Sequence, residues 1–396
     1  MKKVLFVVDE RKLGGVSIVL ENILKNISRK KLDITVLVLH NNGDRLVNLP
    51  EDIKIIYGNS YFNTVDLDFS SLLKSKKIFK ALKKLYVSLL IKSGKIEKYI
   101  SLARSKMGLE QYDVEIAFKA GFCSLFVAYG NASYKINWVH EDYKTYNKTK
   151  RYENTFKTAF NAFDKHIIVS KESAKSFNNI YGMETKTLVI NNYIDIEEIR
   201  EKSKLESELT VIKDKLNVVT LGRFCNEKGF DRLIDAIYRL KEENSKKLDG
   251  LKIYILGYGE DECMLRNMIR GYNLAEYIQV INVKELENNP YAFMRLCDIY
   301  IMPSRSESFG MVRIEALLLG LPVITTNVAN AKEMINSDIG IVVGNSLDGI
   351  YNGLEEILKD DTIILKFKKN LKTYSYDKEN ERIIKDIENL LEESCE

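Results

Sequence analysis

The sequence has few of the residues from which metal centres and disulfides are built. It holds five cysteines and three histidines in 396 residues, and no two cysteines form a Cys-x-x-Cys pair. An odd number of scattered cysteines is typical of reduced thiols in a cytoplasm and argues against a zinc site. Three histidines also argue against a histidine-rich metal centre. We therefore expect no metal site and a cytoplasmic location.

Long apolar runs are missing as well. No stretch reaches the roughly 18 consecutive apolar residues that a membrane-spanning helix needs. Lys2 and Lys3 before the apolar residues 4–8 resemble the start of a signal peptide, but Asp9 and Glu10 follow at once. The segment is therefore predicted to be a buried strand. With 45% hydrophobic and 29% charged residues, the composition is that of a globular protein.

Charge of either sign is nearly balanced overall but unevenly distributed. A net charge of +4 is too small to indicate nucleic-acid binding. Residues 72–107, however, hold eleven lysines and arginines and one acid, Glu97, so the charge of this stretch is +10 and that of the remaining chain is −6. The stretch is the main electrostatic feature of the sequence.

Apolar residues recur at helical spacing within this basic stretch, at Ile78, Leu82, Leu85 and Leu89. The lysines that flank this stripe are Lys76, Lys77, Lys80, Lys83 and Lys84. Two interpretations fit the pattern equally. A basic amphipathic helix can lie on an anionic membrane surface, or its lysines can form a solvated face over a stripe that packs into the core.

Short apolar strands alternating with helical patterns dominate the rest of the chain. Their residues are 4–8, 34–39, 114–118, 136–139, 167–170 and 188–190, then 218–221, 253–256, 278–281, 299–302 and 323–325. Such strands are typical of parallel sheets covered by helices on both faces. The charged segment 195–214 separates the two series. We therefore expect an α/β protein with two facing doubly wound, Rossmann-like domains, and ligands in the cleft between them.

Two cations follow a strand of the second series. The segment 222–229, Gly-Arg-Phe-Cys-Asn-Glu-Lys-Gly, comes directly after strand 218–221. Gly222 permits a sharp turn, and Arg223 and Lys228 can direct two positive charges at one point beyond the sheet. A diphosphate suits such a pair, because arginine binds two oxygens and lysine supplies a point charge. Surface charge on a loop is the alternative.

Two glutamates follow strand 299–302. Glu307 lies in a loop and Glu315 about two turns into the helix that begins after it, so both can reach one cleft. The backbone N–H groups at the start of that helix form an anion site. Carboxylates beside a diphosphate would repel it unless they bind hydroxyl groups, which a sugar and a ribose supply. The expected nucleotide-binding residues here are Ser308, Phe309, Gly310, Met311 and Val312.

Glycines follow two further strands. Gly14 and Gly15, after the first strand, permit a ligand to approach a helix N-terminus, although they also suit a merely flexible loop. Gly257 opens a Gly-Tyr-Gly turn after strand 253–256. This turn lacks the third glycine of a dinucleotide fingerprint, so it predicts a tight turn close to a nucleotide and argues against a NAD-dependent oxidoreductase.

Together these residues resemble glycosyltransferase family 4, whose members are retaining transferases of GT-B fold. The resemblance covers almost the whole chain and rests on Gly14-Gly15, on residues 222–229, and on Glu307 and Glu315 in the spacing Glu-x7-Glu. It implies that residues 1–200 bind the acceptor and 201–375 the nucleotide-sugar. It also implies that 376–396 form a helix that packs back on the first domain.

The resemblance implies a role for each matching residue. Arg223 and Lys228 would hold the diphosphate, Glu307 would contact the donor sugar and Glu315 the ribose hydroxyls. His140, at the end of strand 136–139, matches a histidine that touches the donor sugar near its reacting face. Tyr193 stands where the family often has glycine, and segment 282–286 lacks a usual glycine. Both departures concern the identity of the base and the sugar.

The predicted activity is therefore sugar transfer from a nucleotide-sugar, a UDP-sugar ahead of a GDP-sugar, to a hydroxyl of a glycan, lipid-linked or protein acceptor in cell-surface glycan synthesis. His140, Glu307, Arg223 and Lys228 are the expected catalytic residues. No cofactor is expected, because the two cations and a helix N-terminus can stabilise the leaving diphosphate. Residues 66–68 match an Asp-x-Asp metal motif but follow no core strand.

Three alternatives stay open. The chain could be a catalytically silent GT-B subunit bound to a partner transferase, a protein-modifying glycosyltransferase, or a phosphorylase-like enzyme with a pyridoxal-binding lysine. If residues 72–107 bind anionic lipid, the protein would lie on the inner face of the plasma membrane.

Overall fold

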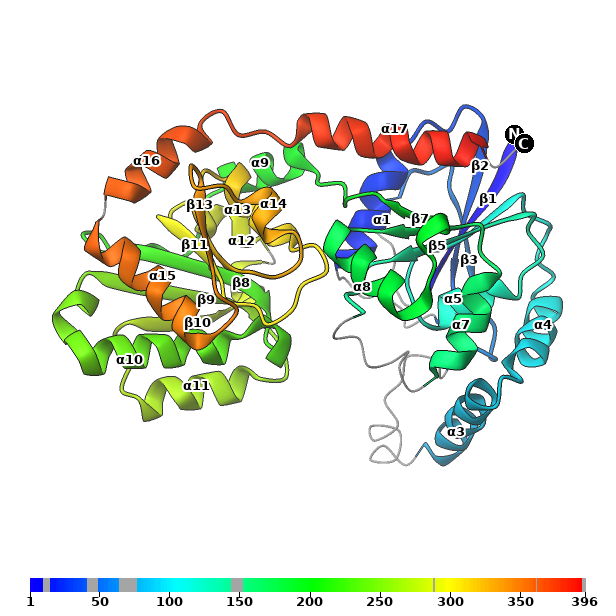
Figure 1. Cartoon of the computed structure of the whole chain (residues 1–396), viewed down its shortest axis with the longest axis horizontal. Coiled ribbons are helices and arrows are strands. Elements are labelled where there is room, and N and C mark those ends of the chain that lie inside the picture. The colour runs from blue at the N-terminus through cyan, green and yellow to red at the C-terminus, as the bar shows by residue number, and fades with distance from the viewer. Residues whose placement is uncertain are drawn as a thin grey trace. The chain divides into compact units, whose positions relative to one another are not determined.

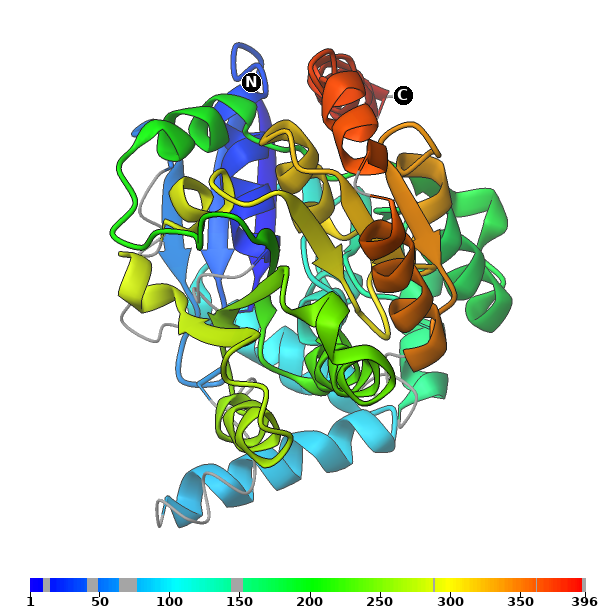
Figure 2. The same ribbon diagram turned by 90° about the vertical axis from the view of Figure 1, so that its left-hand side faces the viewer.

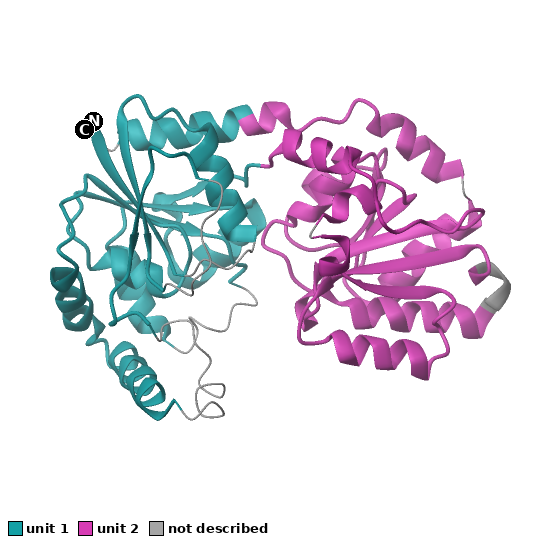
Figure 3. Ribbon diagram, turned by 180° about the vertical axis from the view of Figure 1, so that it is seen from behind, with its two compact units in different colours: residues 1–193, 381–396 teal, residues 194–380 magenta. Residues whose placement is uncertain are grey.

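The computed structural model describes residues 1–9, 15–40, 49–63, 77–143, 152–287, 289–360 and 362–393, with the side chains of 244–247 left out. The chain folds into two compact units (Figure 3). Unit 1 comprises residues 1–193 and 381–396, and unit 2 comprises residues 194–380. That the units face each other across a cleft stays a prediction. Among the described residues, no helix has the length and apolar character to cross a bilayer.

Unit 1 is built on a seven-stranded sheet of order β3-β2-β1-β4-β5-β6-β7, in which every pair is parallel (Figure 1). Its strands are β1 (Lys2–Val8), β2 (Leu32–Val38), β3 (Lys54–Tyr57), β4 (Val114–Ala117), β5 (Tyr134–Val139), β6 (Lys165–Ile168) and β7 (Thr187–Val189). Its helices are α1 (Gly15–Asn26), α3 (Ile78–Lys92), α4 (Ile96–Met107), α5 (Phe122–Ala128), α7 (Glu153–Asn161), α8 (Lys171–Tyr181) and the short η1 (Glu184–Lys186).

Unit 2 repeats the design with a six-stranded parallel sheet of order β10-β9-β8-β11-β12-β13 (Figure 2). Its strands are β8 (Leu216–Arg223), β9 (Leu251–Tyr258), β10 (Ile278–Asn282), β11 (Ile299–Met302), β12 (Val323–Thr326) and β13 (Gly340–Val343). Its helices are α9 (Ile196–Lys204), η2 (Asn226–Lys228), α10 (Phe230–Leu248), α11 (Glu262–Gly271), η3 (Val283–Leu286), α12 (Pro290–Met294), α13 (Met311–Leu318), α14 (Ala331–Met334), α15 (Leu347–Lys359) and α16 (Thr362–Leu371).

Successive residues of a strand are buried on opposite faces of the unit 2 sheet. Val218 and Ile253 belong to one apolar cluster, together with residues of α10, α11 and α15. Their neighbours Val219 and Tyr254 belong to a second cluster, with residues of α12 and α13. Because both faces are covered, the strands are apolar throughout, and the predicted doubly wound architecture is confirmed.

The last helix, α17 (Asp377–Glu393), runs from unit 2 into unit 1. Within unit 1 the Nζ of Lys2 donates to the Leu391 carbonyl at 2.6 Å, and the backbone N–H of Ser28 donates to Glu388 at 2.8 Å. These contacts bring the end of the chain against its beginning. The boundaries at 193 and 380 lie a few residues from the expected 200 and 375.

Candidate active site

The loops that follow β8 and β11 are fastened to each other in unit 2. The Arg305 guanidinium forms a two-point ion pair with Asp231, with Nη1 at 2.7 Å from Oδ1, and it also donates to the Asn226 carbonyl at 2.8 Å. The backbone N–H of Arg305 donates to the Glu227 carbonyl at 2.7 Å. Arg305 therefore positions the glutamate-bearing loop against the lysine-bearing loop.

Strand ends β8 and β9 approach each other closely at two glycines. Gly222 and Gly257 are partners in the parallel ladder, and a Cβ on Gly257, whose φ is +157°, would lie 1.9 Å from the Gly222 carbonyl oxygen. No side chain fits there. Gly257 is thus required for the packing of the strand ends, and nucleotide contact at this residue stays a prediction.

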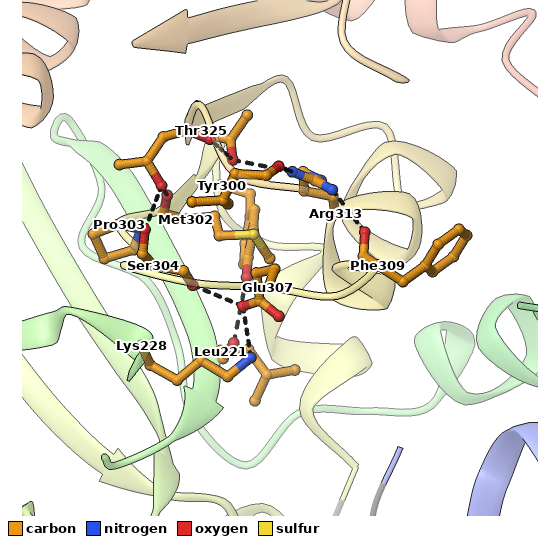
Figure 4. A network of polar contacts seen from close by, with 12 residues as sticks. Leu221, Lys228, Tyr300, Met302, Pro303, Ser304, Glu307, Phe309, Arg313 and Thr325 are labelled. Atoms are coloured by element: carbon orange, nitrogen blue, oxygen red, sulfur yellow. Dashed lines mark hydrogen bonds and ion pairs between the residues drawn. The ribbon is translucent and has the colours of Figure 1, made fainter. Parts of the chain in front are cut away.

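Lys228 and Glu307 form the central ion pair of the site (Figure 4). The Lys228 ammonium donates to Glu307 Oε1 at 2.6 Å, and the Ser304 hydroxyl donates to the same oxygen at 2.7 Å. Burial alone would raise the pKa of Glu307, but the charge and hydrogen bond of Lys228 hold it below the usual value. Glu307 is therefore a carboxylate, and its negative charge balances the positive charge of Lys228 before any anion binds.

Arg223 does not share this partner. It is the last residue of β8 and is exposed, and its side chain interacts with the Cys225 thiol and the Glu227 carboxylate. The structure thus brings Lys228 to Glu307, whereas Arg223 hydrogen-bonds the Cys225 thiol and interacts with the charge of Glu227. A joint grip of both cations on one diphosphate stays a prediction.

A buried arginine braces the start of α13. Gly310, with φ +78°, precedes the helix, and a Cβ there would lie 2.8 Å from Arg313 Nη2. The Arg313 side chain is fully buried and donates to the Phe309 carbonyl (Figure 4) and to Asn330 Oδ1, each at 2.7 Å. Its hydrogen-bond acceptors in the described chain are carbonyl, amide and hydroxyl oxygens, so its charge is offset only at longer range, chiefly by Glu307.

Arg313 is a residue that reasoning from the sequence missed. A single arginine inside the apolar helix sequence Met-Val-Arg-Ile-Glu-Ala-Leu-Leu was the available signal. Its surroundings place a permanent positive charge directly behind the helix N-terminus that is expected to bind an anion.

Glu315, which also lies on α13, is buried. Burial raises the pKa of Glu315 to about 7, against the opposing hydrogen bond from the Tyr291 hydroxyl and the charge of Lys228. Tyr291, on α12, was also missed, because nothing in the sequence relates it to a residue of α13. Glu315 consequently titrates close to neutral pH, in contrast to Glu307.

His140 lies in unit 1, directly after β5. Its ring packs against Phe118, with centroids 4.8 Å apart, and is parallel to Trp138 at 6.2 Å. Burial and the nearby Lys119 charge lower the pKa of His140 to about 3, so the imidazole is neutral. Its Nε2 is buried and has no hydrogen-bond partner among the described residues. This histidine can bind a hydroxyl group but cannot supply positive charge.

The remaining predicted residues lie at the starts of helices α1 and α13 or outside the described residues. Gly15 begins α1, whereas Gly14 lies outside the described residues. Ser308, Met311 and Val312 are half-buried at the start of α13. The Asp-x-Asp string at 66–68 also lies outside the described residues, and within them no three His, Cys, Asp or Glu side chains are grouped as a metal site requires.

Comparison with known proteins identifies the second half of the chain. Residues 201–378 match the family model described as glycosyl transferases group 1. Unit 2 is a domain of the group 1 glycosyl transferases.

Two relatives in sequence match about half of the chain. One is the Campylobacter jejuni N-acetylgalactosamine-N,N'-diacetylbacillosaminyl-diphospho-undecaprenol 4-alpha-N-acetylgalactosaminyltransferase, 31% identical over 48% of each chain. Another is the Mycobacterium tuberculosis GDP-mannose-dependent alpha-(1-6)-phosphatidylinositol monomannoside mannosyltransferase, 26% identical over 48% of this chain and 52% of that one. The chain therefore spans about half the length of these relatives.

Similarity in structure extends over the whole chain. The crystal structure of Anabaena HepE in complex with UDP and glucose covers 98% of this chain and 100% of its own, with a TM-score of 0.66 and 16% identity. At that identity the similarity shows the fold. The chain thus has the GT-B fold that its resemblance to family 4 implies.

The brace of α13 can be tested by Arg313→Met, which keeps the length of the side chain and removes its charge and donors. We expect the free energy of unfolding of the chain to fall by about 1–3 kcal/mol, because the Phe309 carbonyl and Asn330 are left buried without a donor. Chemical denaturation measures this. Arg266→Met, at an exposed ion pair on α11, is the matched control and should change stability by less than about 0.5 kcal/mol. Equal effects of the two changes would contradict the brace.

Glu315 should make nucleotide binding depend on pH. If the carboxylate accepts hydrogen bonds from ribose hydroxyls, the protonated form binds poorly, so affinity for UDP-glucose should fall about tenfold from pH 8 to pH 6. Calorimetry at several pH values measures it. Glu315→Gln should bind more weakly throughout and lose this pH dependence, and the ratio between wild type and variant cancels any titration of the ligand. A ratio that does not change with pH would refute the assignment.

Proposed function

We propose that the chain is a retaining glycosyltransferase that moves a sugar from a nucleotide-sugar donor to an acceptor hydroxyl without a metal ion. The observation that carries this proposal is the Lys228–Glu307 pair beside the braced N-terminus of α13. One partner suits a phosphate oxygen and the other suits sugar hydroxyls. Their loops are held together by Arg305 before any ligand arrives.

The proposed chemistry depends on the charge of the leaving group. As the bond from the sugar to the diphosphate breaks, negative charge develops on the diphosphate oxygens and must be stabilised in the transition state. Lys228, Arg223 and the first N–H groups of α13 supply that stabilisation, and the buried Arg313 adds a fixed positive potential. Binding transfers the Lys228 ammonium from Glu307 to a phosphate, which frees Glu307 to accept hydrogen bonds from the sugar.

Retention follows from attack on the face that the leaving group departs from. The acceptor hydroxyl enters as the diphosphate leaves, forms the new carbon–oxygen bond, and passes its proton to a departing phosphate oxygen. His140, as a neutral imidazole, hydrogen-bonds a sugar hydroxyl in this scheme, and Glu315 binds the ribose. The acceptor binds unit 1, and unit 2 holds the donor.

Donor and acceptor classes follow by analogy with the related proteins. HepE is solved with UDP and glucose, which supports a UDP-sugar, while the mannosyltransferase uses GDP-mannose and keeps a GDP-sugar as the second choice. Both sequence relatives are named for lipid-linked acceptors, a diphospho-undecaprenol and a phosphatidylinositol. We propose a lipid-linked glycan as the acceptor, in cell-surface glycan synthesis, ahead of a polysaccharide or a protein hydroxyl.

Metal-independent donor binding is the first consequence. Calorimetric titration of the chain with UDP and with GDP in excess EDTA should give saturable binding, tighter for UDP, because fixed cations replace the metal. Lys228→Gln, which keeps the stem and removes the charge, should weaken that binding by about 1.5–3 kcal/mol. Binding that appears only after Mg²⁺ or Mn²⁺ is added would contradict the metal-free mechanism.

Substitution of Glu307 should affect turnover, whereas substitution of Glu315 should affect nucleotide affinity. Glu307→Ala should abolish most turnover of the donor but leave affinity for the free nucleoside diphosphate nearly intact, since its proposed partner is the sugar. Glu315→Ala should weaken nucleotide affinity by about 1–3 kcal/mol. Donor hydrolysis by the isolated chain and UDP calorimetry report the two effects separately. Loss of UDP binding in Glu307→Ala would show that the division is wrong.

A further inference from the structure

Helix α3 of unit 1 carries an exposed apolar face. Six of its large apolar side chains are between 46% and 89% exposed, with Phe79 the most exposed of them. They are Ile78, Phe79, Leu82, Leu85, Tyr86 and Leu89. Scattered apolar residues on a surface are ordinary, but six on one helix form a continuous patch of the kind that marks an interaction site.

These six side chains share one side of the helix. At about 100° per residue they fall within an arc of about 120°, along a helix about 22 Å long. The other side fixes α3 to unit 1: Ala81 and Val87 are buried, and the Ile91 carbonyl accepts a hydrogen bond from Thr155 at 2.6 Å. Of the two interpretations of this stripe, the one in which it packs into the core is therefore wrong, because the buried side is the opposite one.

No lysine of α3 falls within the arc of the apolar face, and the charge of the helix is positive throughout. Helix α3 contains no acid, and its exposed lysine Lys92 borders the arc of the apolar face. Lys77 and Lys80 are exposed at the N-terminal end of the helix, outside that arc, and the exposed Lys95 and Lys98 follow the helix. Lys83 is different: its ammonium donates to the Ser60 carbonyl and to Asn63, and burial lowers its pKa. Lys83 is thus a structural residue, and Lys76 lies outside the described residues.

We propose that this face docks unit 1 on an anionic lipid bilayer. The apolar side chains would enter the boundary between headgroups and acyl chains, and the long side chains of the lysines at the two ends of the helix would reach anionic headgroups. A second copy of the chain is a poorer partner, because pairing two such faces would bring together two sets of lysines with no acid on either helix. A bilayer offers both the apolar interior and the opposite charge.

Vesicle co-sedimentation of the full chain tests the proposal independently of its transferase activity. Vesicles of phosphatidylcholine with phosphatidylglycerol should bind the wild type, and vesicles of phosphatidylcholine alone should bind at least about tenfold less. Binding should weaken when the salt is raised from 0.05 to 0.5 M, because the Debye length shortens.

Two variants divide the contributions of the face. Leu82→Glu with Leu85→Glu places charge in the apolar face, and Lys77→Gln with Lys80→Gln removes positive charge at the N-terminal end of the helix. Each should lower the vesicle affinity at least about tenfold, since each lysine contributes about fivefold. The matched controls are Leu365→Glu and Lys366→Gln with Lys369→Gln, at exposed positions of α16, and should bind as the wild type does.

Unchanged circular dichroism and thermal unfolding will show that the variants fold. If the folded wild type fails to bind anionic vesicles, or if the α3 variants and the α16 controls bind equally, the proposal is overturned. It is overturned equally if light scattering shows a dimer that the paired leucine changes dissociate while vesicle binding is absent.

Discussion

The parallel pairing of β8 with β9 on one side and β11 on the other is the constraint on which the candidate site depends. Because all three strands point the same way, the loops that follow them meet at one edge of the sheet. The contact between Gly222 and Gly257 and the clamp of Arg305 on Asp231 are consequences of that meeting. Lys228 and Glu307, which are distant in the sequence, come within hydrogen-bonding distance for the same reason.

Burial of Glu315 at this edge of the sheet makes the stability of unit 2 depend on pH. The folded chain holds the Glu315 proton up to a pKa of about 7, against 4.5 for an ordinary glutamate. Between these values the folded state binds more protons than the unfolded state, so unit 2 loses stability as the pH rises from about 4.5 to about 7. A carboxyl group whose pKa is shifted in this way by burial is typical of a functional site.

Reasoning from the sequence found what depends on local patterns. Apolar runs gave the central strands of both sheets and the edge strands β7 and β10. The edge strands β3 and β13, in which at most one residue is fully buried, were not expected. The loops that carry Lys228 and Glu307 were found from glycines and strand ends. The pairing of Arg313 with Phe309 and Asn330, and of Tyr291 with Glu315, depends on how helices pack, and no spacing in the sequence encodes that.

Helix α3 shows the same limit of reasoning from the sequence. Its periodicity indicates an amphipathic helix but does not say which side meets the protein, so the two interpretations could not be separated. The side of the helix that meets the rest of unit 1 carries small or slender residues. Ala81 and Val87 let the helix lie close to the core, with Ile91 beside them. The larger apolar side chains are turned outward. Because exposing that face to water carries a cost in solubility, a chain that retains it gains most if a bilayer covers it.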